Sequence, residues 1–537
     1  MKFVSVPEMI AIEKQADYSG LSYAMMMENA GSGLAKVIHE RYQDLIPGPV
    51  LGLVGSGNNG GDTLVALDYL SRWGWQTQAY IARPRSGDDQ LVKRLIDAGG
   101  LLVDGEKDPS FEILAELVKN CCLLLDGVLG TGIKLPLRGR IAEVLRYSRD
   151  QLRNMEDPPV VVAVDCPSGI DCDTGEAAEE CFPANMTVTM AAVKQGLLRF
   201  PAYSYLGDLQ LVGIGLGESL LAWKNIRRQV VGDDFVLKSL PARRLDAHKG
   251  TFGTAMVIAG SKNYPGAALL AGQAAYRIGA GLVTLAVPEV IYPVLAGNFV
   301  EATWLPLSHE DGSISEASSS TILRNLEKLT AILIGPGLGL AETTGKFVSS
   351  LISGLNRHQP DVQQSGLSTI DDLTVLPGFV FDADGLKLLA GIPDWHKRLP
   401  APSVLTPHPG EMSVLTGIPV KDIQADRLGI AENYAKLWGH VVILKGALSV
   451  IASPDGETAI IPVATPALAR AGTGDVLAGL VVGLRAQGVE PYPAAAAASW
   501  IHARAGLRAA AVLGSSAAVL AGDILQGVVD ILAELAN

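Results

Sequence analysis

The chain has 537 residues, of which 48% are hydrophobic and 18% charged, so intrinsic disorder is excluded and either two domains or one domain with a large insertion is expected. Its 43 basic and 56 acidic side chains give a net charge of −13, which argues against a nucleic-acid partner. The five cysteines form no CxxC pair and there is no HExxH motif, so neither a zinc site nor a disulfide framework is predicted. Glu8 and Glu13 interrupt the apolar run that a signal peptide needs, and no apolar run is long enough to cross a membrane. We expect a cytoplasmic protein that does not contact membranes.

The first half of the chain alternates short apolar runs with helical patterns. Ser5 and Glu8 form an S-x-x-E capping pattern that predicts the start of a helix, and a second helix is expected over 25–45. Strands are then expected at 50–55, 76–82, 122–126, 160–165 and 187–192, and the series fades after 209–216. They are almost entirely apolar, which is typical of parallel strands covered by helices on both faces. The sequence predicts a doubly wound α/β domain over residues 1–225.

A second series of the same kind follows an irregular, basic stretch at 223–244 that we interpret as a linker. Its strands are expected at 255–260, 282–287, 331–335, 379–382, 404–406 and 441–444. Two complete series, each with its own glycine-rich turns, favour two doubly wound domains over one long sheet. The second domain is expected over residues 230–537, with the polar stretch 359–374 as a surface insertion.

A glycine-rich turn, GSGNNGGDT at 55–63, follows the strand predicted at 50–55 and fits G-x-G-x-x-G. The pattern suits a dinucleotide site or simply a tight turn, and the acidic residue expected after the next strand is absent, because that strand runs into Arg83. Three oxygen-bearing side chains, Asn59, Asp126 and Ser168, also follow strands. Together they suit a monovalent or divalent cation, although a single Asp at such a place is more often a helix cap.

The first half carries an ordered set of motifs: MENAG (27–31), GNNGGD (57–62), DGVLGTG (126–132), DCPSGID (165–171) and Lys194. The set resembles the YjeF N-terminal family, the NAD(P)H-hydrate epimerases, over about residues 1–220. The resemblance implies a Rossmann-like three-layer sandwich in which Asp165, with Lys194, is the catalytic acid/base that opens and recloses the hydrated ring. It also implies a potassium ion (K+) held by Asn59, Asp126 and Ser168.

The same resemblance implies which residues contact the hydrated nucleotide. They are Asp165 and two segments: Asn58, Asn59, Gly60, Gly61 and Asp62, then Gly130, Thr131, Gly132, Ile133, Lys134, Leu135 and Pro136. Thr63 departs from the glycine expected after NNGGD. We expect it to tighten the pocket slightly without affecting the chemistry.

The strongest local signal of the second half is AGTGDV at 471–476, which precedes an apolar helix. Free amides at a helix N-terminus bind anions, and glycines let the backbone approach them closely. Asp475 can accept a proton from a hydroxyl that attacks a phosphoryl group, but it can also be a plain helix cap. The pattern G-x-x-x-x-G-K-[ST] is absent, so a P-loop is excluded. Other strand ends carry GPGLG (335–339), DAD (382–384), TPHPGE (406–411) and Lys445–Gly446.

With the HKG at 248–250, these motifs resemble the ribokinase-like YjeF C-terminal family, the ADP- or ATP-dependent NAD(P)H-hydrate dehydratases, over about residues 230–535. The resemblance implies that Asp475 is the base in phosphorylation of the ring hydroxyl, that phosphate then leaves, and that Mg²⁺ bridges the nucleotide phosphates. The implied contacts of the hydrate are Ala280, Gly337, Gly339, His408 and Asp475. Those of the adenine nucleotide are Lys445, Gly446, Ala447, Leu448, Ser449 and Gly474.

The sequence therefore predicts a bifunctional repair enzyme, an isomerase and a lyase. It would interconvert the R and S hydrates of NADH and NADPH (NADHX and NADPHX) and dehydrate the S form at the expense of ADP or ATP. A ribokinase-like small-molecule kinase fused to a nucleotide-binding domain is one alternative, and a non-catalytic binding protein is another. The HPGE and HKG motifs favour the dehydratase over the kinase, and the intact Asp165, Lys194 and Asp475 argue against loss of catalysis. We also expect a homo-oligomer.

Overall fold

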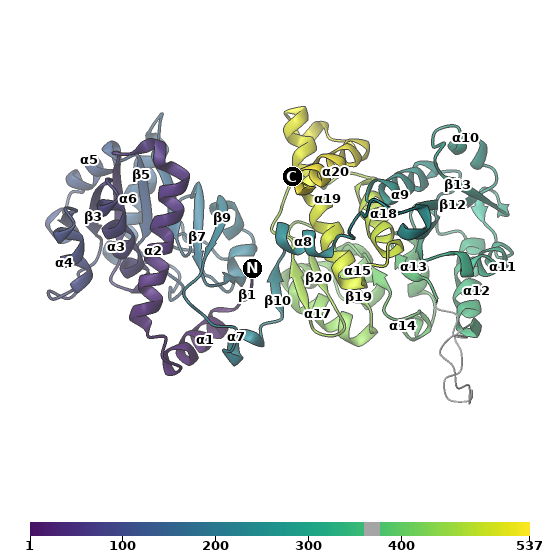
Figure 1. Cartoon of the computed structure of the whole chain (residues 1–537), viewed down its shortest axis with the longest axis horizontal. Coiled ribbons are helices and arrows are strands. Elements are labelled where there is room, and N and C mark those ends of the chain that lie inside the picture. The colour runs from purple at the N-terminus through teal and green to yellow at the C-terminus, as the bar shows by residue number, and fades with distance from the viewer. Residues whose placement is uncertain (359–375, 537) are drawn as a thin grey trace. The chain divides into compact units, whose positions relative to one another are not determined.

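The computed structural model describes residues 1–358 and 376–536 and forms two compact units, Met1–Arg228 and Gln229–Asn537 (Figure 1). The surface insertion predicted at 359–374 lies outside the described residues. Both units are α/β, with a mostly parallel sheet between helices, which confirms the predicted fold class.

The first unit is built on a parallel sheet of seven strands in the order β4-β3-β2-β5-β6-β7-β9. The strands are β2 (Pro49–Val54), β3 (Gln76–Ile81), β4 (Leu101–Asp104), β5 (Leu123–Gly127), β6 (Val160–Val164), β7 (Met186–Met190) and β9 (Asp208–Val212). Two of these strands, β4 and β9, were not predicted. Leu101 and Leu102 of β4, at one sheet edge, are exposed and give no buried apolar pattern, and β9, at the other edge, is mostly only partly buried. The chain order reverses at β2, and such a switch point opens a crevice outside the carboxyl ends of the strands.

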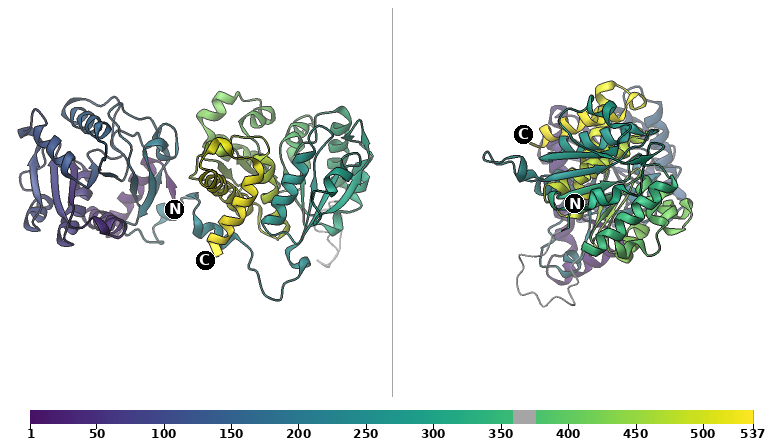
Figure 2. Two further views of the ribbon diagram at one scale, coloured as in Figure 1. Left: turned by 90° about the horizontal axis from the view of Figure 1, so that it is seen from above. Right: turned by 90° about the vertical axis from the view of Figure 1, so that its right-hand side faces the viewer.

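Helices cover both faces of this sheet and complete three layers (Figure 2). One hydrophobic cluster includes residues of α1 (Val6–Tyr18), α2 (Tyr23–Tyr42), α3 (Asn58–Arg72) and α4 (Gln90–Asp97). The other includes residues of α5 (Glu112–Asn120) and α6 (Gly139–Asn154). The predicted capping box is confirmed, since the Glu8 amide donates to Ser5 Oγ (3.3 Å) and the Ser5 amide to Glu8 Oε2 (2.7 Å). Just before α1, β1 (Phe3–Val4) pairs with β8 (Val193–Lys194).

The second unit contains a sheet of ten strands in the order β10-β21-β20-β19-β18-β17-β16-β11-β12-β13. The strands are β10 (Arg228–Val230), β11 (Thr254–Ile258), β12 (Leu282–Pro288), β13 (Thr303–Leu307), β16 (Ala331–Ile334), β17 (Gly378–Phe381), β18 (Val404–Leu405), β19 (Val441–Leu444), β20 (Val450–Ala452) and β21 (Thr458–Ile460). β20 runs antiparallel to both of its neighbours. A separate hairpin pairs β14 (His309–Glu310) with β15 (Ser313–Ile314).

The stretch interpreted as a linker, 223–244, is more ordered than predicted. It contains the end of α7 (Leu221–Lys224), the edge strand β10 and α8 (Asp233–Ser239). Its basic residues suggested a free connection, but Val230 and Val231 are buried, and the Val231 amide donates to the carbonyl of Ile460 in β21. A strand of three residues forms because it pairs with the neighbouring strand, and it is too short to show a recognisable pattern in its own sequence.

Helices surround the second sheet as well. They are α9 (Pro265–Arg277), α10 (Tyr292–Ala296), α11 (Ser318–Leu323), α12 (Glu342–His358), α13 (Asp384–Ala390), α14 (Trp395–Arg398), α15 (Pro409–Thr416), α16 (Val420–Ala425), α17 (Arg427–Trp438), α18 (Thr473–Ala486), α19 (Pro491–Leu513) and α20 (Ala521–Ala536). Among the helices of the described residues, none has the length and apolarity that a membrane crossing requires.

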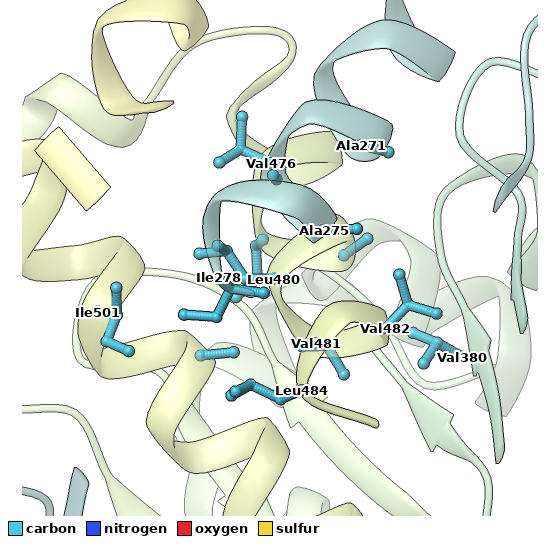
Figure 3. Close-up of a cluster of buried hydrophobic side chains, with 14 of the residues drawn as sticks. Ala271, Ala275, Ile278, Val380, Val476, Leu480, Val481, Val482, Leu484 and Ile501 are labelled. Atoms are coloured by element: carbon cyan, nitrogen blue, oxygen red, sulfur yellow. The ribbon is translucent and has the colours of Figure 1, made fainter. Parts of the chain in front are cut away.

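Close packing of α18 against α9 positions the turn that precedes α18. A Cβ on Gly479 would lie 2.2 Å from the carbonyl oxygen of Ala271, and one on Gly483 would lie 2.8 Å from that of Ala275. Only glycine allows this approach of two helix backbones. Ile278, Leu480 and Ile501 are among the side chains of the core cluster in this region (Figure 3).

Candidate functional site

The first site is built around an ion pair at the carboxyl edge of the first sheet. Asp165 directly follows β6 with φ +64°, a left-handed conformation that is uncommon for a residue with a side chain. Its Oδ1 accepts from the ammonium of Lys194, from the Met190 amide (2.9 Å) and from Thr189 Oγ1 (3.1 Å). Lys194 is 2% exposed. Burial lowers the pKa of Lys194, but the Asp165 carboxylate outweighs this effect and the pKa lies above its ordinary value.

Two further carboxyl groups interact with this pair. Asp62 on α3 is 9% exposed, and its pKa lies well above the ordinary value, first because of burial and then because of the charge of Asp165. Glu13 on α1 also has a raised pKa, again mainly because of burial. Glu13 was not predicted as a site residue, because no motif surrounds it. One signal was present: Glu13 is four residues after Met9 and three before Ala16, both buried, so it shares the packed face of α1.

The three residues predicted to bind a cation come together around the backbone of Leu129. Asn59 Nδ2 donates to the Leu129 carbonyl (2.7 Å), and the Leu129 amide donates to Ser168 Oγ (2.9 Å). The Ser168 amide donates to Asp126 Oδ2 (2.7 Å). Within the described part of the chain, Asn59 Oδ1 and Asp126 Oδ1 are buried oxygens with no hydrogen-bond donor.

Such unpartnered oxygens are rare in proteins and fit a hard cation, which binds oxygen ligands. Burial raises the pKa of Asp126 to about 6. An adjacent positive charge would favour its ionised form.

The glycine-rich turn brings the predicted substrate segments to the same edge. A Cβ on Gly55 would lie 1.9 Å from the Val128 carbonyl oxygen, so this turn packs directly against the segment that follows β5. Residues 58–62 form the start of α3, and 130–136 form the loop that leads from β5 to α6. Thr63 is fully buried and donates to the Asn59 carbonyl (2.8 Å), so its role is to pack the turn.

The second site includes Asp475, which lies in the first turn of α18. Gly472, with φ +89°, is the N-cap of that helix, so Asp475 is not the cap. In the described residues, no donor hydrogen-bonds to its carboxylate. Burial, and secondarily the charge of Asp382, raise the pKa of Asp475 to about 7. A base with this pKa suits proton transfer at neutral pH.

A buried lysine faces the same turn. Lys445 Nζ lies 2.6 Å from Asp382 Oδ1 and 3.6 Å from Glu411 Oε2, with the side chain 16% exposed. A Cβ on Gly474 would lie 3.6 Å from this ammonium, so Lys445 and the helix N-terminus converge on one place. Burial lowers the pKa of Lys445, but the Asp382 and Glu411 carboxylates outweigh this effect, so the pKa lies above its ordinary value.

Residues 445–449 form the hairpin turn between β19 and β20. Gly446 (φ +150°) and Leu448 (φ +57°) have positive φ angles, and Ser449 Oγ donates to the Gly446 carbonyl (2.9 Å). The Leu448 side chain is buried, whereas Gly446 and Ala447 are exposed. This turn therefore offers a ligand backbone atoms and the side chains of Lys445 and Ser449.

His408 caps α15. Its Nδ1 accepts from the Gly410 amide (2.9 Å), and the His408 amide donates to Glu411 Oε2 (2.8 Å). Burial lowers the pKa of His408, so the ring is neutral at pH 7. Nδ1 is an acceptor in this cap, so the proton of the neutral ring is on Nε2.

The remaining predicted contacts of the hydrate lie in two places. Gly337 follows β16 and packs against Ala267, whose Cβ would be 2.8 Å from a Cβ on Gly337. The Gly339 amide donates to Asp384 Oδ2 (2.9 Å). Both glycines are at the carboxyl edge with Asp475 and Lys445. Ala280 precedes β12 at the opposite, amino edge, and the structure does not bring it to the others.

The chain is similar to known proteins over both units. A family model described as YjeF-related protein N-terminus matches residues 23–196, and one described as NAD(P)H-hydrate dehydratase matches residues 255–527. The bifunctional NAD(P)H-hydrate repair enzyme of Moorella thermoacetica is 35% identical over 535 residues, covering 98% of this chain and 96% of the relative. That of Salinibacter ruber is 36% identical, covering 96% and 93%. The chain belongs to the bifunctional NAD(P)H-hydrate repair enzymes.

Among solved structures, the second half is similar to the ADP/ATP-dependent NAD(P)H-hydrate dehydratase of Bacillus subtilis, co-crystallised with ATP and Mg²⁺. The TM-score is 0.46 and the identity 30%, over 57% of this chain and 98% of the other. The two family models match the two halves that the motifs distinguish.

Proposed function

We propose that each unit of this repair enzyme carries one activity. The first interconverts the R and S hydrates of NADH and NADPH, and the second dehydrates the S form in a reaction that consumes ADP or ATP. The observation that carries this assignment is the similarity to bifunctional repair enzymes over 98% of the chain, together with one buried lysine–carboxylate pair in each unit.

Epimerisation starts with Asp165. Its carboxylate is paired with the Lys194 ammonium, and Asp165 accepts the proton of the ring hydroxyl. The ring then opens, and reclosure from the other face inverts the carbon that carried the hydroxyl. The hydrated ring lies against the start of α3 and the loop 130–136 in this proposal.

Asn59, Asp126 and Ser168 would hold K+ beside this segment, and the two unpartnered oxygens of Asn59 and Asp126 support the choice of a hard cation. When bound, the ion supplies a positive charge near the turn that receives the nucleotide. The three side chains connect α3 with the ends of β5 and β6, so they also hold the two substrate segments together.

Dehydration uses Asp475 as the base for the ring hydroxyl as it attacks the terminal phosphoryl group of the nucleotide. The amides of the turn 472–474 and the Lys445 ammonium stabilise the charge on the transferred group. The phosphate formed on the ring is a better leaving group than hydroxide, and its departure as inorganic phosphate, together with a proton from the neighbouring ring carbon, restores the double bond of the dihydropyridine. Gly337, Gly339 and His408 contact the hydrate in this proposal, whereas 445–449 and Gly474 contact the nucleotide.

Mg²⁺ would be held mainly by the nucleotide, because the described residues include no group of three or more His, Cys, Asp or Glu side chains that could bind a metal ion. When bound, it neutralises the phosphate charge. A cytoplasmic location and a homo-oligomeric assembly remain predictions from the sequence.

The deciding experiment is a turnover assay with purified hydrate epimers. The full chain is expected to interconvert R and S forms without nucleotide, and to form NADH or NADPH only when ADP or ATP is added. Nucleotide consumption without formation of the reduced cofactor would favour a small-molecule kinase instead.

A further inference from the structure

We infer that Asp62 is a second catalytic residue of the first site, the proton donor that acts together with Asp165 during epimerisation. The inference rests on the proposed epimerase function and adds a group that the reaction requires.

The chemistry needs two proton carriers. When the hydrated ring opens, the hydroxyl proton goes to a base, and the O–H electron pair forms a carbonyl. The bond from this carbon to the ring nitrogen breaks, and its electron pair stays on the nitrogen, which takes a proton from an acid. Reclosure reverses both transfers after the carbonyl has turned its other face to the nitrogen. Atoms and charges balance with one base and one acid, and no oxidant or cofactor is consumed.

The charged groups around Asp165 show which carboxyl group is the base and which is the acid. Among the described residues, the charged groups that act on Asp62 are the carboxyl groups of Glu13 and Asp165 and one ammonium, that of Lys194. Lys194 bonds directly to Asp165, which is therefore the carboxylate and the base. Asp62 is 9% exposed and, among the described residues, has no hydrogen-bond or ion-pair partner.

Burial and the neighbouring charge of Asp165 raise the pKa of Asp62 well above its ordinary value, whereas Lys194 acts in the opposite direction. These effects favour the protonated form of Asp62. Glu13 is the other titratable group that acts on it, and it also raises the pKa of Asp62. A buried carboxyl group without a cation beside a carboxylate that is paired with one is a common arrangement of an acid and a base in one site.

Its place in the fold favours Asp62 over Glu13 as the donor. Asp62 is three residues after Asn59 on α3, inside the segment 58–62 that contacts the hydrate in the proposed function. The start of this helix is held firmly, since a Cβ on Gly60 would lie 2.1 Å from the Gly55 carbonyl oxygen. Glu13 extends from α1, is partly exposed, and lies outside both substrate segments.

The test uses three variants of the full chain, with conversion of the pure R hydrate to the S hydrate as the readout. Asp62→Asn keeps the size but not the acid, and its kcat is expected to fall by roughly 10²–10⁴-fold with little change in KM. The wild-type kcat should fall at high pH, where Asp62 loses its proton, and this alkaline limb should be absent in Asp62→Asn. Asp62→Glu should restore part of the rate together with the limb. Asp97→Asn, which changes an exposed carboxyl on α4, is the matched control.

Dehydration of the pure S hydrate by the same samples reports on the second unit, and thermal unfolding of the first unit reports on its folding. A kcat of Asp62→Asn within tenfold of wild type refutes the inference. So does a loss confined to KM with the alkaline limb intact, because Asp62 would then only bind substrate. A larger loss in Glu13→Gln than in Asp62→Asn assigns the donor to Glu13 and also overturns it. A wild-type chain with no epimerase activity refutes the proposed function itself, and the inference with it.

Discussion

Replacing Asp475 by Asn tests whether the carboxylate at the start of α18 is a catalytic base. Asn has nearly the same shape but cannot accept a proton from the ring hydroxyl. The dehydration rate is expected to fall by roughly 10²–10⁴-fold, which corresponds to about 2.7–5.5 kcal/mol on the barrier. Nucleotide binding should persist, because the turn amides and Lys445 are unchanged. Epimerisation, which takes place in the other unit, should keep its rate.

The raised pKa predicts two pH effects. Dehydration by the wild-type chain should increase as the pH rises through about 7, where Asp475 becomes ionised, and then level off. Stability should change in the opposite direction. In the unfolded chain Asp475 ionises near its ordinary pKa of 3.8, but in the folded chain it keeps the proton up to about pH 7. Between these values the folded state binds more protons, so each pH unit lowers stability by about 1.4 kcal/mol, to a total of about 4 kcal/mol at most.

Asp475→Asn has no ionisable group at this position, so its stability does not fall between pH 4 and pH 7 for this reason. Without nucleotide, it should unfold at a higher temperature than wild type at pH 8, and the difference should disappear near pH 4. The matched control is Asp523→Ala, since Asp523 Oδ2 accepts the Leu520 amide (2.8 Å) at the start of α20 and is a true capping contact. That variant should lose about 1 kcal/mol of stability and retain dehydration. If Asp475→Asn dehydrates the hydrate at a near wild-type rate, or is less stable than wild type at pH 8, the assignment of Asp475 as base is wrong.

Three further outcomes are expected. Asp126→Ala should abolish the stimulation of epimerisation by added K+ and leave dehydration unchanged; an equal loss of both activities would indicate a role in folding. Lys194→Met leaves the Asp165 carboxylate without its cation, and breaking a buried pair costs about 3–5 kcal/mol. The variant should therefore lower the midpoint of thermal unfolding of the first unit and strongly reduce epimerisation. An unchanged midpoint would mean that the pair contributes nothing to stability. Fragments 1–228 and 229–537 should each fold and retain one activity, measured with the separated hydrate epimers, because each unit has its own core; two insoluble fragments would contradict this.

The strands that form the two sites could be predicted because they are buried on both faces. Runs such as 123–125 and 160–164 are wholly apolar, and each leads to polar residues at its carboxyl end. Parallel pairing brings these ends to one edge, which is why Asn59, Asp126 and Ser168 meet as expected. Short or partly exposed edge strands have no such pattern, so β4, β9 and β10 were not predicted.

Other parts of the sites depend on contacts between distant segments. Glu13 interacts with Asp165 and Lys194 because β1, a strand of two residues, pairs Val4 with Lys194 and so brings α1 to the site. No local pattern predicts that pairing. In the second unit, the alanine beside Gly337 is Ala267 at the start of α9, whereas Ala280 lies beyond the other end of that helix. Both alanines lie in stretches of small residues, so the sequence does not show which of them is near Gly337. The direction of α9 decides this, because its start is next to Gly337 and its end leads to Ala280.

The two sites use the same electrostatic arrangement for opposite purposes. In each, one buried lysine is bonded to one carboxylate, Lys194 to Asp165 and Lys445 to Asp382. A second carboxyl group nearby has no cation bonded to it, and burial, followed by the charge of the first carboxylate, raises its pKa. The pKa of Asp62 lies well above its ordinary value, which favours the proton donor, whereas that of Asp475 is raised to about 7, which suits a base at neutral pH. In both units the lysine only partly offsets this rise, so the second carboxyl group is available for proton transfer while the first remains paired.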